Sequence, residues 1–245
     1  TAEVAGTPVA IAVLCDGVSS SPRPDDASLA GARAAVRVLL QSARAGYPEA
    51  DEASREAVHA AFDALSGLTG PDGAPAATYA SALVADGTAT ICWLGDSRIY
   101  WLAQAGSERL TTDDSLASDI VAAGLMEEAQ ALTMPQAHVI TRWLGADMTE
   151  APDEHIMTFT PPGPGVLMLC TDGLWNYQPA ADGLASLALP RALDDPAGAA
   201  AALLKFALDA GGMDNITIVL IRFPLVPSPD SADATDSPPN RSGLE

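Results

Sequence analysis

The feature that most constrains this chain is a short apolar run that ends in an acid. Seven consecutive apolar residues, Val9 to Cys15, lead directly into Asp16 and Gly17. A run this short and this apolar is typical of a strand that is buried on both faces. An unpaired carboxylate is unfavourable in such a place, because burial removes its hydration. We therefore expect a metal ion, an arginine or water at the end of this strand.

The charge balance limits the classes of partner. The chain has 245 residues, enough for one sizeable domain. Its 32 acidic residues outnumber its 12 basic residues, which gives a formal charge of −20. This argues against a nucleic-acid partner, because phosphate backbones are bound by clustered Lys and Arg. The balance is compatible with divalent cations, although we expect most of these acids to form a highly soluble surface.

The sequence carries no recognisable membrane or export signal. No apolar run approaches the roughly 18 residues of a membrane span, and the first residues do not resemble a signal peptide. We therefore expect no membrane partner and a cytoplasmic location. Cys15, Cys92 and Cys170 each lie within or at the end of an apolar run, without the spacing of a zinc site. We expect three free thiols in the core.

Periodicity divides the chain into helical and strand segments. A helix is predicted with an apolar stripe from Leu29 to Ala43 and with Asp26 or Ser28 as its N-cap. A second helix is predicted near residues 51–67. Strands are predicted over 79–85, 88–94 and 98–103, and Asp86-Gly87 favours a hairpin between the first two. The remaining expected elements are a strand over 1–5, a helical pair over 114–131 broken at Gly124, a strand near 154–160, a strand over 165–171, a helix that begins at Asp195-Pro196, and a strand over 216–223.

Residues 226–245 differ in composition from the rest of the chain. They are rich in Pro, Ser, Asp, Ala and Asn. Such a segment cannot bury enough apolar surface to order itself. We predict a domain over residues 1–225 and a disordered tail or linker over 226–245.

Four carboxylates recur in the same local setting. Three of them, Asp16, Asp96 and Asp172, follow the carboxyl ends of apolar strands, and Asp214 precedes one. Because alternate strands of an antiparallel sheet bring opposite ends to one rim, all four acids can converge there. Any one of them alone is better explained as a turn residue. Four clustered carboxylates repel one another unless hard divalent cations compensate them, and a two-metal site that activates water for attack on phosphorus follows.

A family resemblance rests on several motifs in order. The chain resembles the type 2C, metal-dependent protein serine/threonine phosphatases of bacterial style over about residues 9–223. The resemblance implies an α+β fold, a four-layer α-β-β-α sandwich of two antiparallel sheets flanked by helices. The matching motifs are Val13–Val18, Leu94–Tyr100, Leu110–Ser115, Ile140–Gly145, Leu169–Trp175 and Asp214–Thr217.

The resemblance also implies roles for particular residues. Asp16, Asp172 and Asp214 would be catalytic through two Mn²⁺ or Mg²⁺ ions, with the Gly17 carbonyl on one of them. Asp96 would belong to a third, weaker metal site. Arg98 would be a buried structural residue. Asp113, Asp114 and the following segment to about residue 139 would form a mobile flap beside the cleft.

Three departures from the family pattern concern the same site. The family places an Arg and an Asn-x-(Asp/Glu) segment one strand before the first Asp-Gly, and this sequence shows neither. Glu3 is the only upstream acid and falls where the intervening strand should be, so we expect that it is not a ligand. Arg23 lies in the loop that replaces a Gly-rich stretch, and we expect a surface residue rather than a phosphate contact. Val18 occupies the position of a histidine that bacterial-type members also lack.

Two functions remain open at this point. The first is metal-dependent hydrolysis of phosphoserine and phosphothreonine in the protein substrates of serine/threonine kinases. The second is a catalytically impaired phosphatase-like module that binds phosphoprotein or a regulatory partner. An unrelated divalent-metal hydrolase such as a nuclease is disfavoured by the acidic charge and the lack of basic patches.

Overall fold

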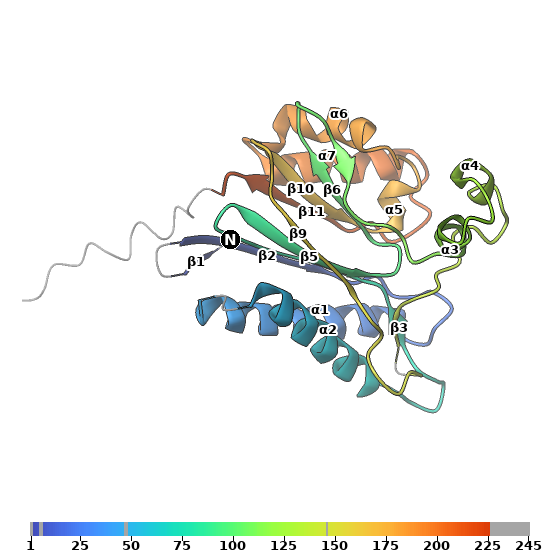
Figure 1. The fold of residues 1–245 in the computed structure, drawn as a ribbon. Coiled ribbons are helices and arrows are strands. Elements are labelled where there is room, and N and C mark those ends of the chain that lie inside the picture. Colours follow the sequence, from blue (N-terminus) through green and yellow to red (C-terminus); the bar gives the residue numbers. More distant parts are fainter. Residues whose placement is uncertain (1, 5–6, 47–48, 146, 226–245) are drawn as a thin grey trace, which may run out of the picture.

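Two antiparallel β-sheets packed face to face form the centre of the molecule, and a pair of helices covers the outer face of each sheet (Figure 1). The computed structural model describes residues 2–4, 7–46, 49–145 and 147–225. The predicted α+β four-layer sandwich is therefore confirmed. The predicted tail, 226–245, lies outside the described residues, so the domain boundary at residue 225 stays a prediction.

The first sheet contains the strand from which the sequence argument began. Its order is β1-β2-β4-β5-β9, and every neighbouring pair is antiparallel. The β4–β5 hairpin has the predicted register, with Ala85 opposite Thr88. The strands are β1 (Ala2–Val4), β2 (Thr7–Leu14), β4 (Tyr79–Ala85), β5 (Thr88–Leu94) and β9 (His155–Phe159).

The second sheet has the order β11-β10-β6-β7 and is also antiparallel. Its four strands are β11 (Ile218–Phe223), β10 (Gly165–Cys170), β6 (Arg98–Leu102) and β7 (Glu108–Arg109), and a separate short pair joins β3 (Ala76–Ala77) to β8 (Leu144–Gly145). Large side chains from both sheets fill the space between them, among them Ile91, Trp101 and Leu167. This burial fixes which ends of the strands meet at each rim of the sandwich.

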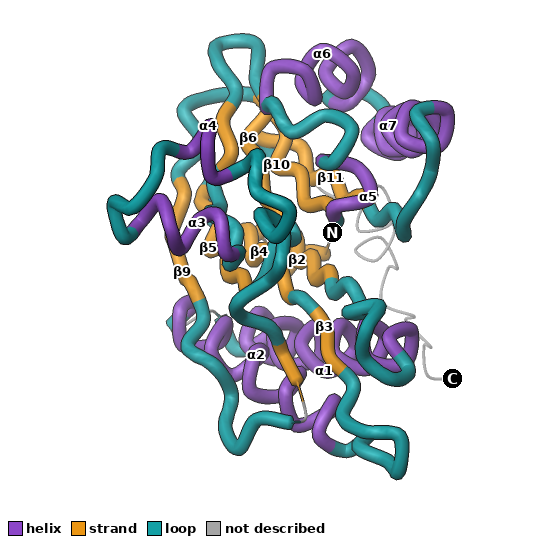
Figure 2. The backbone as a smooth tube through the Cα atoms, turned by 90° about the vertical axis from the view of Figure 1, so that its right-hand side faces the viewer, coloured by secondary structure: helices purple, strands orange, loops and turns teal. Residues whose placement is uncertain are grey.

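Helices α1 (Pro24–Arg44) and α2 (Ala50–Ser66) cover the first sheet, and α6 (Ala181–Ala192) and α7 (Pro196–Asp209) cover the second. The short helices α3 (Leu116–Ala122) and α4 (Glu128–Ala131) lie outside the sandwich, beside one end of it (Figures 1 and 2). Helix α5 (Asp172–Trp175) begins directly after β10. No helix of the described residues is both long and apolar enough to cross a membrane.

The structure corrects the predicted details of α1. The helix begins at Pro24 after Arg23, which has φ 53°, so neither Asp26 nor Ser28 is its N-cap. The predicted apolar face was also wrong in part, because Leu29 is 49% exposed. The buried stripe is instead Ala27, Gly31, Ala35, Leu39 and Ala43. Small side chains occupy this face because α1 lies so close to its neighbours that even a Cβ on Gly31 would crowd α2 and Cys15.

The helix at 181–192 was not predicted. Its residues are apolar or small on almost every side, and Pro190 lies in its last turn. Both features hide the 3.6-residue period that identifies an amphipathic helix. Helix α7, in contrast, begins as predicted after Asp195, whose Oδ1 accepts a hydrogen bond from the Gly198 amide at 2.8 Å.

Candidate metal centre

Four aspartates from distant parts of the chain line one small cavity. Its volume is about 180 Å³, and its walls include Asp16, Asp96, Asp172 and Asp214. Asp16 follows β2, Asp96 lies in the turn between β5 and β6, Asp172 opens α5 and Asp214 precedes β11. The convergence that the antiparallel arrangement predicted is therefore present, at the end of the sandwich that carries α5 (Figure 1).

Asp16 is held by the neighbouring strand. The Asp16 amide donates to Thr78 Oγ1 at 3.1 Å, and the Thr78 amide donates to the Asp16 carbonyl at 2.8 Å. The buried Ser97 hydroxyl lies 2.8 Å from Thr78 Oγ1 and links this contact to the residue after Asp96. Gly17 is required next, because any Cβ there would collide with the Pro24 carbonyl.

Asp172 and Asp214 are brought together by a backbone crossing. Thr171 Oγ1 donates to the Asn215 carbonyl at 2.9 Å and accepts from the Thr217 amide at 3.0 Å. A Cβ on Gly173 would collide with the Asn215 carbonyl, so only glycine allows this approach. The Asp-Gly pair at 172–173 thus fixes the distance between two strands that carry acids.

Two side chains at the end of α5 contact the acidic site: Trp175, the last residue of the helix, and Asn176, which follows it. Trp175 Nε1 donates to the Asp96 carbonyl at 2.9 Å, and Asn176 Nδ2 donates to Asp172 Oδ2 at 3.3 Å. Trp175 is 2% exposed. Its indole N–H therefore positions the turn that holds Asp96.

The electrostatics of the cavity are those of uncompensated acids. Burial, followed by the charges of Asp172, Asp214 and Asp96, raises the pKa of Asp16 to about 7. Burial, followed by the charges of Asp172 and Asp113, raises the pKa of Asp96 to about 7. Burial and the Asp214 charge raise the pKa of Asp172 as well. None of the described residues that line the cavity is Lys, Arg or His.

The oxygen atoms that line the cavity are chemically suited to bind hard divalent cations. Carboxylate and carbonyl oxygens are the ligands that Mg²⁺ and Mn²⁺ prefer, and a cation would supply the missing positive charge. The side chains do not yet form a closed cage. Within the described ranges, no three His, Cys, Asp or Glu side chains are grouped closely enough to hold one ion. The site therefore has converging ligands whose carboxylates must still turn toward a shared ion.

A second group of acids lies nearby and is paired within the protein. Arg98 donates to Asp113 Oδ1 at 2.9 Å through Nε and to Oδ2 at 2.7 Å through NH2, and both side chains are buried. The Arg98 guanidinium also lies 3.6 Å above the ring centroid of Trp175. The predicted structural role of Arg98 agrees with this geometry.

Asp114 anchors both ends of the segment between β7 and β8. Its Oδ2 accepts from the Gly95 amide at 2.9 Å, and its Oδ1 lies 3.2 Å from Arg142 NH1 and 2.8 Å from His155 Nε2. Its carbonyl accepts from the Thr141 amide at 2.9 Å. The structure corrects the predicted start of the mobile flap, because Asp113 and Asp114 are buried anchors paired within the protein.

The three residues of the predicted departures lie in different places, and only Val18 lines the cavity. Arg23 binds Asp26 at 2.8 Å and the Leu68 carbonyl at 3.1 Å, as a surface residue would. The backbone of Glu3 pairs with Pro8, eight residues before Asp16, which is about 26 Å along a strand. Val18 lines the cavity without a titratable group.

The three cysteines are free thiols, as expected. Cys92 and Cys170 are buried, and Cys15 is half-buried. Burial raises the pKa of Cys15 to about 12, with a smaller contribution from the neighbouring Asp16 charge. None of the three is activated as a nucleophile.

A comparison with family models finds one match. The family described as "Protein phosphatase 2C" matches residues 2–195 of this chain. Among curated proteins, a serine/threonine phosphatase stp from Listeria innocua is 31% identical over 144 residues, which is 59% of this chain and 55% of the relative. The chain thus spans about half the length of the curated relatives it matches.

Solved structures give similar matches. The PPM Ser-Thr phosphatase MsPP from Mycobacterium smegmatis, in complex with cacodylate, is 27% identical with a TM-score of 0.65, and the match covers 90% of this chain and 99% of that one. The catalytic domain of the phosphatase PstP, in complex with two manganese ions, is 23% identical with a TM-score of 0.66 over 87% of this chain and 89% of that one. These matches extend the fold similarity beyond the segment that the curated sequences cover.

Proposed function

The chain belongs to the protein phosphatase 2C family, and on this premise we propose that it hydrolyses phosphoserine and phosphothreonine in proteins by means of a metal-activated water. The observation that carries the proposal is the cavity lined by four aspartates without a compensating cation among its described lining residues. The named phosphatase relatives support the same reaction class.

We assign the metal ligands by position. Asp16 with the Gly17 carbonyl, Asp172 and Asp214 would hold two Mn²⁺ or Mg²⁺ ions, and Asp96 would contribute to a third, weaker site. The manganese ions of the PstP neighbour and the oxygen donors of this cavity support that assignment. Ions held there would lower the pKa of a bound water and so supply the nucleophile for direct attack on phosphorus, without a phosphoenzyme.

Residues around the cavity position the backbone of two proposed metal ligands. Thr78 holds the Asp16 backbone, and Trp175 holds the carbonyl of Asp96. Because the described lining has no Lys or Arg, the charge of a substrate phosphate must be met by the ions rather than by this part of the chain. Bound ions would favour the ionised forms of Asp16 and Asp96, whose pKa burial and neighbouring carboxylate charges raise to about 7 in the absence of metal.

The substrates we propose are phosphoproteins made by serine/threonine kinases. We propose a cytoplasmic location, which the three free thiols support, because free thiols persist in reducing compartments. We also propose that residues 1–225 form the catalytic domain, with neither nucleic acid nor a membrane as a partner. The acidic composition supports the exclusion of nucleic acid.

A second candidate function is a phosphatase-like module that binds phosphoprotein without turnover. One observation favours it: no three His, Cys, Asp or Glu side chains of the described chain are already grouped around one point. Both functions share the same fold and the same four aspartates.

The test is Mn²⁺-dependent hydrolysis of a phosphothreonine peptide. We expect turnover that EDTA abolishes and that Asp172→Asn lowers by about 1,000-fold or more. Asp182→Asn, on the exposed side of α6, is the matched control and should retain full turnover. Equal turnover in the wild type and Asp172→Asn contradicts the metal assignment. Mn²⁺ binding without turnover favours the binding module.

A further inference from the structure

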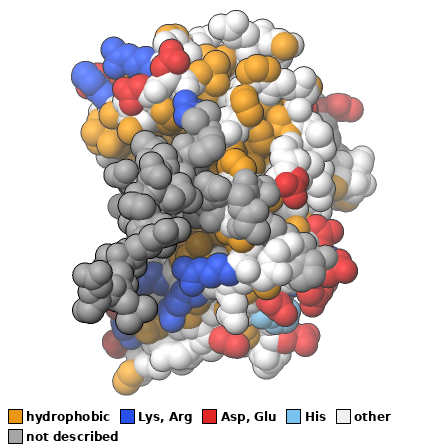
Figure 3. Space-filling model, turned by 90° about the vertical axis from the view of Figure 1, so that its left-hand side faces the viewer, with side chains coloured by type: hydrophobic (Ala, Val, Ile, Leu, Met, Phe, Trp, Pro, Cys, Tyr) orange, Lys and Arg blue, Asp and Glu red, His pale blue; other side chains and the backbone are white. Residues whose placement is uncertain are grey.

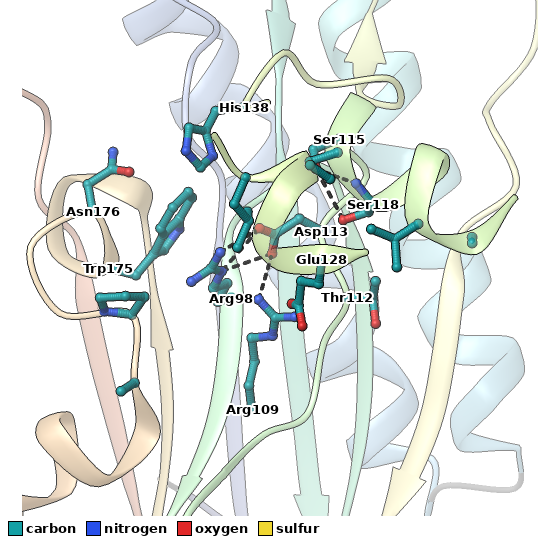
Figure 4. A pocket seen from close by; sticks show the side chains of 17 residues that line it. Arg98, Arg109, Thr112, Asp113, Ser115, Ser118, Glu128, His138, Trp175 and Asn176 are labelled. Carbon is teal, nitrogen blue, oxygen red and sulfur yellow. Dashed lines mark hydrogen bonds and ion pairs between the residues drawn. The ribbon is translucent and has the colours of Figure 1, made fainter. Parts of the chain in front are cut away.

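A second cavity lies beneath the short helices α3 and α4. We call it the flap pocket and define it by Arg109, Val121, Glu128, Leu132, His138 and Trp175. Its volume is about 580 Å³, in the range of sites that hold a small organic molecule. Figure 4 shows the pocket between the α3–α4 segment on one side and β6 and α5 on the other. None of its lining residues also lines the acidic cavity.

The walls of the flap pocket are mainly apolar. Helices α3 and α4 contribute Ala117, Val121 and Leu132. Opposite them, the ring of Trp175 forms part of the wall, with the His138 ring tilted against it at a centroid distance of 5.7 Å. Such a surface suits an aliphatic or aromatic body.

One cation on this wall is incompletely paired. Arg98 already occupies both oxygens of Asp113, at 2.9 and 2.7 Å. Arg109 NH1 therefore reaches Asp113 Oδ1 only at 4.0 Å, beyond hydrogen-bonding distance, and its side chain is 32% exposed. Within the described ranges Arg109 has no other ion pair. Its guanidinium donors are available to an anion, and the guanidinium fork matches a carboxylate or sulfonate.

Glu128 lines the same pocket with the opposite charge, from α4. No ion pair joins Glu128 to Arg109 in the described structure, although Figure 4 shows both directed to the same side of the pocket. A cationic ligand would meet only this exposed carboxylate, because Arg98 already covers the face of Trp175. An anion is therefore the better match, and Glu128 should oppose it.

The other large cavity lacks this feature. It lies at the opposite end of the sandwich, the end that Figure 3 faces, and has a volume of about 640 Å³. Prolines such as Pro161 and Pro164 line it, and Asp86 is its only charged described residue. Its apolar surface is comparable, but it offers an anion no cation.

We propose that the flap pocket is a second ligand site, for a small organic anion with an apolar or aromatic body that binds Arg109 and packs against the apolar side chains of the α3–α4 segment. This site is distinct from the proposed phosphatase centre and does not depend on it. The two would communicate, because Trp175 donates to the Asp96 carbonyl and Asn176, also in the pocket wall, donates to Asp172.

The probe is 8-anilinonaphthalene-1-sulfonate, an aromatic sulfonate whose fluorescence rises in apolar sites. Titration into the folded wild-type chain should give saturable binding. Arg109→Gln should raise the dissociation constant about tenfold, the usual effect of losing one charge-assisted hydrogen bond. Glu128→Gln should lower the dissociation constant, because the variant removes a negative charge that repels the sulfonate. Ala122→Trp should fill the pocket and abolish binding, whereas Ala123→Trp, one residue further and outside the lining, should not.

Circular dichroism melts verify that each variant is folded before titration. Wild-type affinity in both Arg109→Gln and Ala122→Trp would mean that the dye binds elsewhere, and the proposal would be wrong. Equal weakening by Arg109→Gln and Glu128→Gln would contradict the choice of an anion. In that case the pocket would take a zwitterion or close through an Arg109–Glu128 ion pair.

Discussion

The molecule contains two groups of buried or partly buried aspartates, and they are stabilised in opposite ways. Asp113 is fully paired with Arg98, and Asp114 is paired with Arg142 and hydrogen bonded to a backbone amide. The four rim aspartates line one cavity without a cation among its described lining residues. They are Asp16, Asp96, Asp172 and Asp214. The first group completes its charges within the chain and holds the structure together. The second group leaves a charge deficit that an external cation can fill.

The largest expected effect is on turnover. The carboxylate of Asp16 is repelled by the charges of all three other rim aspartates. Because Asp16→Asn removes this central carboxylate, we expect Mn²⁺-dependent peptide hydrolysis to fall by about 1,000-fold or more. Steady-state assays at saturating Mn²⁺ measure this loss. The matched variant Asp25→Asn, in the exposed first turn of α1, should leave the rate unchanged. A rate in Asp16→Asn within a factor of ten of the wild type would contradict a catalytic role for the rim.

The paired group should respond in stability rather than in metal binding. Arg98→Met leaves the buried Asp113 carboxylate without its partner, and we expect unfolding to become easier by about 3–5 kcal/mol. Urea unfolding measures the difference. The double variant Arg98→Met/Asp113→Leu removes both charges and should recover most of the loss. No recovery in the double variant would mean that packing against Trp175, and not charge pairing, is the main contribution of Arg98.

The rim should make the metal-free protein sensitive to pH. Burial and neighbouring carboxylates raise the pKa of Asp16 and of Asp96 to about 7 in the folded chain, from the ordinary aspartate value of 3.8. Between these values the folded state binds more protons than the unfolded state, so stability falls as pH rises and levels off above about 7. Thermal melts in EDTA at pH 5, 6 and 8 should show the wild type losing stability relative to Asp16→Asn. Mn²⁺ at pH 8 should reverse the loss, and a pH-independent difference would count against uncompensated acids.

The smallest effect should come from the half-exposed partner of Asp114. Arg142 is 38% exposed, so its ion pair is screened by water. We expect Arg142→Met to destabilise the chain by about 1 kcal/mol or less, several-fold less than Arg98→Met. Urea unfolding of the two variants in parallel measures the ratio. A loss as large as that of Arg98→Met would show that Asp114 depends on Arg142 as fully as Asp113 depends on Arg98.

Much of the site was predictable because its signals are local. Each rim aspartate borders a strongly apolar strand, and the antiparallel order of the strands then brings the four acids together. Gly17 and Gly173 were also readable, since an Asp-Gly pair after a buried strand indicates a close backbone approach. The period-two strands and the Asp86-Gly87 hairpin agree with the structure for the same reason.

The remaining features depend on tertiary contacts that no local pattern encodes. Thr78 lies 62 residues from Asp16 in sequence, and His155 lies 41 residues from Asp114, yet each contact is made through a single side chain. The buried face of α1 was mispredicted because alanine and glycine, not leucine, fit between α1, α2 and the sheet. Hydrophobicity alone does not reveal how closely two elements approach.

A calorimetric titration of Mn²⁺ into the chain at pH 7.5 tests most directly whether the rim aspartates form a metal site. Wild type and the control Asp182→Asn should bind Mn²⁺ with the same affinity, and Asp172→Asn should bind at least about tenfold more weakly, because it loses a carboxylate ligand. Binding should also release protons, since Asp16 and Asp96 are partly protonated without metal. Equal affinity in Asp172→Asn and the wild type would contradict the assignment of the rim as the metal centre.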